Sequence, residues 1–216
     1  RSTLFPYTTF FRSPYRHTGS GVFTVDNWQT VGDTLTALTQ RFRDVRTVDL
    51  GGGLGVPERL GQQGVVLPEL GATLAAIKAA HPKLAFWIEP GRYLVAEAGV
   101  LLAQVTQVKG KGEVHYVGVA TGMNSLIRPA LYGAHHEILN LSRLDDPATE
   151  VVSVVGPICE SGDQLGVDRL LPPTEEGDIL LIATAGAYGR SMSSRYNLRD
   201  PAIWRSEERR VGKECR

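Results

Sequence analysis

The stretch GVLLAQVTQVKGKGEVHYVGVAT (residues 99–121) decides how the rest of the chain is interpreted. Apolar and polar residues alternate on both sides of a Lys-Gly-Lys-Gly turn, which is typical of a β-hairpin with one buried face. Two further apolar runs, EVVSVVGPI (150–158) and GDILLIATAGAY (177–188), follow with no strong helical pattern between them. These patterns predict an all-β domain, a β-sandwich or β-barrel, over residues 98–205.

The residues before the hairpin follow a different pattern. Helical spacing predicts two helices, the first from about Asn27 and the second with Pro68 in its first turn. Their apolar faces are Val31, Leu35, Leu38 and Phe42 in the first helix, and Leu70, Leu74 and Ile77 in the second. Two short apolar strands, RTVDLGGGLG (46–55) and KLAFWIEPG (83–91), alternate with these helices. The alternation predicts β/α units around a parallel sheet over residues 14–97, the C-terminal part of a (β/α)8 TIM-like barrel.

Composition excludes several classes of function. The 216 residues carry a formal net charge of zero with no basic stripe, so a nucleic-acid partner is not indicated. No apolar run is long enough to cross a membrane. The two cysteines, Cys159 and Cys215, give no disulfide framework, so we expect a reducing, cytoplasmic location.

The two ends of the chain do not fit these patterns. Residues 1–13 and 206–216 fit no periodic element and are similar to peptides translated from sequencing-adapter DNA. We therefore expect both segments to be non-native and exclude them, with Cys215, from the fold. The alternative is a pair of ordinary disordered termini.

Three clusters in the α/β region carry candidate chemistry. Glu89 and Arg92 surround a Pro-Gly corner at a strand end, where barrel enzymes place their active sites; the alternative is a structural Glu89–Arg92 ion pair. The glycines 51–53 end the preceding strand, where backbone N–H groups can bind an anion or simply form a tight turn. His17 and Ser20 lie among glycines, where they suit a ring and a phosphate, or are a surface histidine and a capping serine.

The β-domain contributes further polar clusters. Arg128 and Tyr132 are four residues apart, and Tyr188 lies in a glycine-rich loop. A polar turn after an apolar strand groups Cys159, Glu160, Ser161 and Asp163. His135 and His136 do not predict a metal site, because adjacent histidines seldom bind one ion and no matching ligand spacing supports them.

Six motifs occur in a fixed order: HTGS (17–20), GGG (51–53), EPGR (89–92), RPALY (128–132), CESGD (159–163) and GAY (186–188). This order resembles the fold-type III decarboxylases that depend on pyridoxal 5'-phosphate (PLP), and among them the diaminopimelate decarboxylases most. The resemblance implies a lyase of lysine biosynthesis that converts meso-2,6-diaminopimelate to L-lysine and CO₂.

The resemblance also implies the residues that bind the cofactor. His17 would stack on the pyridine ring and Glu89 would bond the pyridine nitrogen, so that the protonated ring accepts electrons from the substrate. The remaining cofactor residues that it implies are Ser20, Gly51, Gly52, Gly53, Gly91 and Arg92 at the phosphate, together with Tyr188.

The substrate residues that the resemblance implies are Arg92, Arg128, Tyr132, Glu160 and Tyr188. Glu160 would recognise the distal ammonium of diaminopimelate, and Cys159 would donate a proton to the carbanion. In the family, Cys159 and Glu160 match residues supplied by the partner subunit of a homodimer, so each active site would need two chains.

Departures from the family pattern keep alternatives open. Thr18, Gly21, Ala120 and Ser125 stand where the family often has other residues. None of the lysines (Lys78, Lys83, Lys109, Lys111 and Lys213) lies in a matching motif, so we expect the Schiff-base lysine upstream of this chain and the chain alone, as a C-terminal fragment, to be inactive. The alternatives are a related decarboxylase of ornithine, arginine or carboxynorspermidine, and a non-catalytic PLP-binding regulator.

Overall fold

The protein is described by a computed structural model for residues 13–42, 44–111, 114–203 and 205. The chain divides into two units, Arg1–Gly99 and Val100–Arg216, which are described separately below. The segments interpreted as non-native, 1–13 and 206–216, fall outside the described residues except for Ser13.

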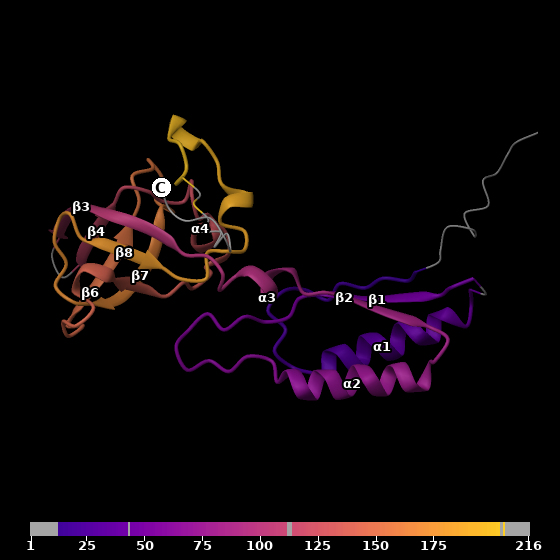
Figure 1. The fold of residues 1–216 in the computed structure, drawn as a ribbon. Helices are drawn as coiled ribbons and strands as arrows, with labels where there is room; N and C mark the ends of the chain where they lie inside the picture. The colour runs from indigo at the N-terminus through magenta and orange to yellow at the C-terminus, as the bar shows by residue number, and fades with distance from the viewer. Residues whose placement is uncertain (1–12, 43, 112–113, 204, 206–216) are drawn as a thin grey trace, which may run out of the picture. The chain divides into compact units, whose positions relative to one another are not determined.

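The first unit is built on two parallel strands, β1 (Thr47–Gly52) and β2 (Ala85–Glu89) (Figure 1). Thr47 pairs with Ala85 at one end of the register, and Gly52 pairs with Glu89 at the other. Along the other edge of β1, two isolated parallel bridges join Tyr15 to Asp49 and Val22 to Leu54. Three chain segments therefore run parallel, with β1 in the middle.

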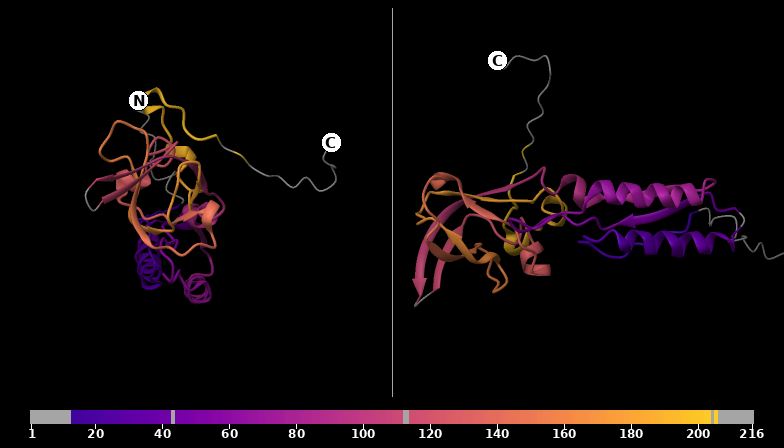
Figure 2. Two further views of the ribbon diagram at one scale, coloured as in Figure 1. Left: turned by 90° about the vertical axis from the view of Figure 1, so that its left-hand side faces the viewer. Right: turned by 90° about the horizontal axis from the view of Figure 1, so that it is seen from below.

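Helices α1 (Asp26–Thr39) and α2 (Leu67–Ala80) lie side by side against one face of these strands (Figures 1 and 2). The two predicted helices are thus confirmed, and Pro68 lies in the first turn of α2. A Cβ atom on Gly32 would lie 2.6 Å from Ile77 Cδ1, so this glycine lets the helices approach closely. The core between helices and strands contains Trp28, Val31, Leu35, Val48, Leu50 and Leu70.

Two expectations for this unit are wrong in detail. The predicted Val31 and Leu35 are buried, together with Trp28, but Leu38 in the last turn of α1 and Phe42 beyond its end at Thr39 are exposed. Strand β2 is not buried throughout: Phe86 packs on the core, whereas Trp87 is 60% exposed. Successive side chains of a strand point to opposite faces, so Trp87 points away from the face on which Phe86 packs.

The second unit is a six-stranded sheet in the order β5-β8-β3-β4-β6-β7. Its strands are β3 (Leu101–Lys111), β4 (Val114–Val119), β5 (Ile138–Asn140), β6 (Glu150–Val155), β7 (Gln164–Leu171) and β8 (Ile179–Ile182). The predicted hairpin is confirmed as the antiparallel pair β3–β4, but its turn was predicted too early: Lys109, Gly110 and Lys111 belong to β3 and pair with residues of β4. Strands β4 and β6 pair in parallel, and the other neighbours are antiparallel.

This sheet curls until its two ends meet (Figure 1). A Cβ atom on Gly166 in β7 would lie 2.8 Å from Ile138 Cδ1 in β5, so the end strands touch. The interior is apolar and includes Val105, Val117, Val152, Val154, Leu165, Leu180 and Ile182. The prediction of an all-β domain is confirmed, and of its two alternatives, β-sandwich or β-barrel, the structure has a barrel-like sheet; the sequence patterns did not indicate β5 or β7.

The first unit also contains the short helix α3 (Gly91–Val95). The second unit contains the short helix α4 (Arg128–Tyr132) and the 3₁₀ turns η2 (Leu141–Arg143), η3 (Arg190–Met192) and η4 (Tyr196–Leu198). Within the part of the chain that the structure describes, no helix has the length and apolar character needed to cross a lipid bilayer.

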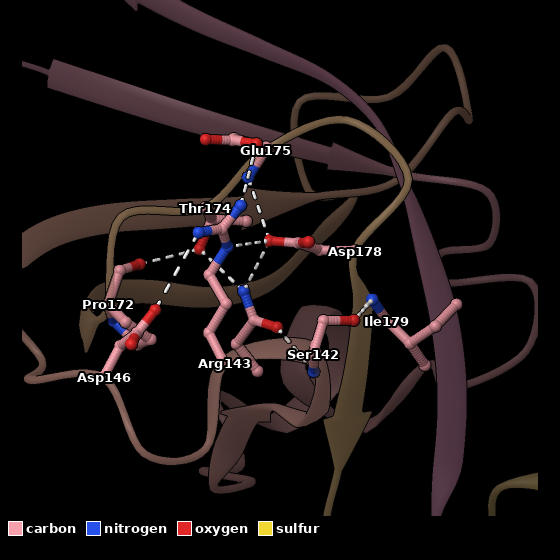
Figure 3. A network of polar contacts seen from close by, with 9 residues as sticks. Ser142, Arg143, Asp146, Pro172, Thr174, Glu175, Asp178 and Ile179 are labelled. Atoms are coloured by element: carbon pink, nitrogen blue, oxygen red, sulfur yellow. Dashed lines mark hydrogen bonds and ion pairs between the residues drawn. The ribbon is translucent and has the colours of Figure 1, made fainter.

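A polar network joins η2 to the turn before β8 (Figure 3). Asp178 Oδ2 accepts hydrogen bonds from Arg143 Nε at 2.8 Å, from Asn140 Nδ2 at 2.9 Å and from the Glu175 N–H at 3.0 Å. Burial alone raises the pKa of Asp178, but these bonds from Asn140, Glu175 and Arg143 outweigh it and hold the pKa below its usual value. The charged carboxylate of Asp178 therefore has hydrogen-bond donors on several sides, and the network holds these segments of the β-unit together.

Candidate active site

The predicted site residues fall into two groups, one in each unit. His17, Ser20, the glycines 51–53 and the corner 89–92 belong to the first unit, and the other predicted residues belong to the second. Each group is built by its own unit.

The glycine loop after β1 is shaped by close backbone contacts. Gly51 and Gly53 have positive φ values of 72° and 102°, and Cβ atoms on them would lie 2.5 Å from Arg16 O and 2.1 Å from Gly19 O. The Gly51 N–H donates to Asp49 Oδ1 at 2.9 Å. The loop therefore needs glycine for its turn and for the approach of residues 16–19, as the tight-turn interpretation requires.

His17 is fixed against this loop. The Gly52 N–H donates to His17 Nδ1 at 3.2 Å, so Nδ1 carries no proton in this arrangement and Nε2 carries the proton of the neutral ring. The amides of both Gly51 and Gly52 are thus engaged within the protein rather than directed at an anion. The imidazole is held at one nitrogen, while the residue itself is exposed.

Glu89 lies beside this histidine at the end of β2. A Cβ atom on Gly52 would lie 2.3 Å from Glu89 O and 3.4 Å from His17 Cε1, so three separate segments meet here. Glu89 is exposed. The pKa of Tyr15 is raised by partial desolvation, then by the charge and hydrogen bond of Glu89 and by Asp49. Tyr15 is thus a neighbour of Glu89 that sequence patterns did not indicate.

Arg92 is the most buried charge of the first group. Its side chain is 9% exposed, and its Nη1 lies 2.8 Å from Glu58 Oε1, so its salt bridge is made with Glu58 rather than with Glu89. The Arg92 Nε atom is buried and has no hydrogen-bond partner among the residues that the structure describes. The backbone of Gly21 approaches closely, because a Cβ atom there would lie 3.4 Å from Arg92 Nη2.

The environment of the Arg92 side chain fits a bound phosphate. A guanidinium binds phosphate oxygens well, and a buried N–H without a partner is costly unless a ligand satisfies it. Cβ atoms on Gly19 and Gly91 would meet no atom within 4 Å, so there is open space beside the backbone on both segments that flank Arg92. Ser20, between Gly19 and Gly21 in the chain, is exposed.

In the second unit, Arg128 is buried on α4 while Tyr132, one turn later, is 64% exposed. His136 Nδ1 lies 2.8 Å from the Ala183 carbonyl, which can only accept, so Nδ1 carries the proton of the neutral ring. Arg128 Nη1 then donates to His136 Nε2 at 3.1 Å. His136 therefore holds the guanidinium of Arg128 in place. The sequence did not predict this contact, because the two residues are eight positions apart and share no motif.

The turn that carries Cys159 and Glu160 is held by Asp163. This buried carboxylate accepts from the Ile158 N–H at 2.7 Å and from the Met123 N–H at 2.6 Å. Cβ atoms on Gly122 and Gly156 would lie 2.2 Å and 2.3 Å from the carboxylate oxygens, so both glycines make room for it. Asp163 is structural, whereas Cys159 and Glu160 are exposed and accessible.

Tyr188 adopts an unusual backbone conformation. Its φ is 63°, in the left-handed region that non-glycine residues seldom occupy, and the residue is 47% exposed. Such strain persists only where surrounding structure imposes it, and it gathers at functional sites.

The adjacent histidines have separate partners. His136 contacts Arg128 and Ala183, whereas His135 Nε2 lies 3.1 Å from Glu137 Oε1 and 2.8 Å from Arg169 Nη1. Among the described residues, no group of at least three histidine, cysteine, aspartate or glutamate side chains is placed to hold a metal ion.

Comparison with known proteins identifies a family. The family model described as pyridoxal-dependent decarboxylase, C-terminal sheet domain, matches residues 22–186. The chain is 45% identical over 157 residues to the diaminopimelate decarboxylase of Archaeoglobus fulgidus, covering 69% of this chain and 36% of that protein. It is 39% identical over 202 residues to the diaminopimelate decarboxylase of Escherichia coli K12, covering 86% of this chain and 48% of that protein.

The structure gives the same picture. The crystal structure of diaminopimelate decarboxylase from M. jannaschii in complex with L-lysine superposes with a TM-score of 0.77 at 35% identity, covering 87% of this chain and 44% of that one. The chain thus spans less than half the length of these relatives.

Proposed function

Since the chain belongs to the pyridoxal-dependent decarboxylase family, we propose that it forms part of a diaminopimelate decarboxylase, which releases CO₂ from meso-2,6-diaminopimelate and leaves L-lysine. The observation that carries this proposal is the identity of 45% and 39% to proteins of that name, which extends across both units. We also propose that the first unit, residues 14–97, is part of a (β/α)8 barrel, which supplies the strand neighbour that the exposed edge of β2 lacks. The β-domain then extends over residues 98–205.

The first unit offers residues that suit PLP. Arg92, with its unsatisfied buried Nε, would hold the phosphate together with the open backbone at Gly91 and the hydroxyl of Ser20. The glycines 51–53 would shape the loop beneath it and hold His17 through the Gly52 N–H. Tyr188, from the β-domain, would complete the cofactor contacts.

When bound, the protonated pyridine ring accepts the electron pair that CO₂ leaves behind. Glu89 would hold the proton at the pyridine nitrogen, because a carboxylate at the end of β2 stabilises the charged ring. His17 would lie against the ring and limit its movement. Glu89 would thus act on the rate, and Arg92 on the affinity for the cofactor.

The remaining residues would bind the substrate. Arg92, Arg128 and Tyr132 would contact carboxylates, and Arg128 is preset for this by its bond to His136. Glu160 would bind the distal ammonium, and Cys159 would give its thiol proton to Cα in place of the lost carboxylate. Both come from the exposed turn that Asp163 holds, which suits a contribution to the site of a second subunit in a homodimer. A reducing cytoplasm suits the free, exposed thiol of Cys159.

The lysine that binds the cofactor covalently is expected elsewhere in the full-length protein. Lys78 Nζ donates to the carbonyl oxygens of Leu84 at 2.6 Å and Pro82 at 3.0 Å, so it fastens the end of α2 rather than serving a site. Lys83 and Lys109 are exposed outside the candidate motifs. We therefore expect these 216 residues alone to be inactive.

The test is CO₂ release by the full-length protein from diaminopimelate, ornithine and arginine in parallel. We expect release from diaminopimelate and a Glu89→Ala variant that keeps PLP but loses at least about a hundredfold in rate. Glu97→Ala, which removes an exposed carboxylate just beyond α3, is the matched control and should retain the rate. Preference for ornithine or arginine would indicate the related decarboxylases, and PLP binding without release from any substrate would indicate a regulator.

A further inference from the structure

The carboxylate of Glu160 already has a partner within its own unit. The Tyr196 hydroxyl donates a short hydrogen bond to Glu160 Oε1. Tyr196 also lies within electrostatic reach of Cys159, the residue before Glu160. The phenol is therefore bonded to Glu160, one of the two residues of this turn to which the proposed function gives chemical roles.

The segment that carries Tyr196 is pinned from both ends. Before it, the Ser194 N–H donates to Asn124 O at 2.9 Å. After it, the Ala202 N–H donates to Ser125 Oγ at 2.8 Å, and Asn124 Nδ2 donates to Asp200 O at 3.2 Å. Asn124 and Ser125 are both buried, so these contacts are sheltered from solvent.

The same loop also fixes the turn of Glu160. Met123, next to Asn124, donates its N–H to Asp163 Oδ1 at 2.6 Å, and Asp163 closes that turn. Residues 123–125 thus hold Glu160 on one side and Tyr196 on the other, so the two side chains are brought together by one common support. The two residues after Tyr196, Asn197 and Leu198, have positive φ values of 54° and 57°. This costly conformation needs a compensating constraint.

We propose that Tyr196 is a positioning residue for substrate recognition: its hydroxyl holds Glu160 Oε1 and leaves Oε2 directed at the distal ammonium of the amino-acid substrate. The inference rests on the proposed function, which assigns that ammonium to Glu160. A carboxylate on a flexible, exposed side chain loses rotational freedom when it binds an ammonium, and a preformed hydrogen bond removes part of that cost. The hydrogen bond and charge of Glu160 raise the pKa of Tyr196, so the phenol remains a donor at neutral pH.

The test compares Tyr196→Phe with wild type in the full-length holoenzyme. We expect the KM for diaminopimelate and the inhibition constant of L-lysine to rise about tenfold, with kcat within about twofold, because the lost interaction serves binding of the distal end. Arg195→Ala is the matched control, since it removes the preceding side chain, which forms an exposed ion pair with Asp200. Its KM should match that of wild type.

A double-mutant cycle with Glu160→Gln separates positioning from folding. If Tyr196 acts through Glu160, Tyr196→Phe should add little to the KM of Glu160→Gln, whereas independent effects would multiply and overturn the proposal. A wild-type KM in Tyr196→Phe, or a loss confined to kcat, would also overturn it. Wild-type enzyme that releases no CO₂ from diaminopimelate would instead refute the proposed function, and the role of Tyr196 with it.

Discussion

Two sites of buried charge, one in each unit, differ in how completely the protein satisfies them. In the β-unit, the carboxylates of Asp163 and Asp178 are surrounded by donors from the same unit. In the α/β unit, Arg92 has a salt bridge with Glu58 and a buried Nε for which the described part of the chain offers no hydrogen-bond partner, next to glycines that leave open space. The first arrangement contributes stability, and the second has unused binding capacity.

This difference indicates where to expect function. A satisfied network gains nothing from a ligand, whereas an unsatisfied N–H in a sheltered place gains a full hydrogen bond when an anion arrives. The α/β unit is also the one whose edge strand leaves Trp87 and Ile88 exposed. Substitutions at Asp163 or Asp178 and at Arg92 should therefore affect different quantities, folding in the first case and cofactor affinity in the second.

The largest expected effect is on folding. Asp163→Ala removes the acceptor for the Met123 and Ile158 N–H groups, and we expect it to lower the free energy of unfolding by about 3–5 kcal/mol. Urea unfolding followed by circular dichroism would measure the loss. Asp145→Ala, at an exposed aspartate of the same unit, is the control, and an equal loss there would contradict the special role of Asp163.

The next effect is on ligand affinity rather than folding. Arg92→Ala should weaken PLP binding by about a hundredfold while the unfolding midpoint changes little, because the guanidinium is matched to an anion. Fluorescence titration of PLP into the full-length apoprotein measures this, with Arg59→Ala at a neighbouring exposed arginine as the control. If the variant lost stability and kept its affinity, Arg92 would resemble the Asp163 network and the contrast between the units would disappear.

The smallest effect depends on pH. Because the pKa of Asp178 is lowered in the folded state, its stabilisation is present above the ordinary aspartate pKa of about 4 and is lost as the pH falls through the lowered value. Asp178→Asn should therefore cost about 2 kcal/mol at pH 7 and much less near pH 2. Urea midpoints of wild type and variant across this range should converge in acid, and a constant gap would refute the linkage.

Sequence patterns predicted the regular parts of the fold and missed contacts between distant segments. Period-2 alternation identified β3 and β4, and helical spacing identified α1 and α2, because these patterns depend on near neighbours. Strand β5 was missed because three residues are too few to show alternation. The exposure of Trp87 was missed because an apolar run predicts a buried strand and contains no information about which face is covered.

The same limit applies to the candidate site. The motifs identified Glu89, Arg92 and Glu160 as candidates by residue type and order. The roles of these three residues remain predictions. Their partners Tyr15, Glu58 and Tyr196 lie far away in sequence and in no recognisable motif. Such partners are determined by tertiary structure, since a tyrosine or glutamate in a loop has many alternatives until the backbone is placed.

The parallel pairing of β4 with β6 has a consequence for how the β-unit forms. The hairpin β3–β4 pairs strands that are almost consecutive in the chain, since β3 ends at Lys111 and β4 begins at Val114, whereas β4 can meet β6 only after residues 120–149 have been enclosed in a loop. Loop-closure entropy rises with the length enclosed, so the hairpin is the pairing that can nucleate early and the β4–β6 contact is the costly step. That long crossover carries α4 with Arg128 and the Asn140 end of the polar network. The residues of the candidate substrate site and the fastening of the sheet are thus expected to reach their native positions in the same late event.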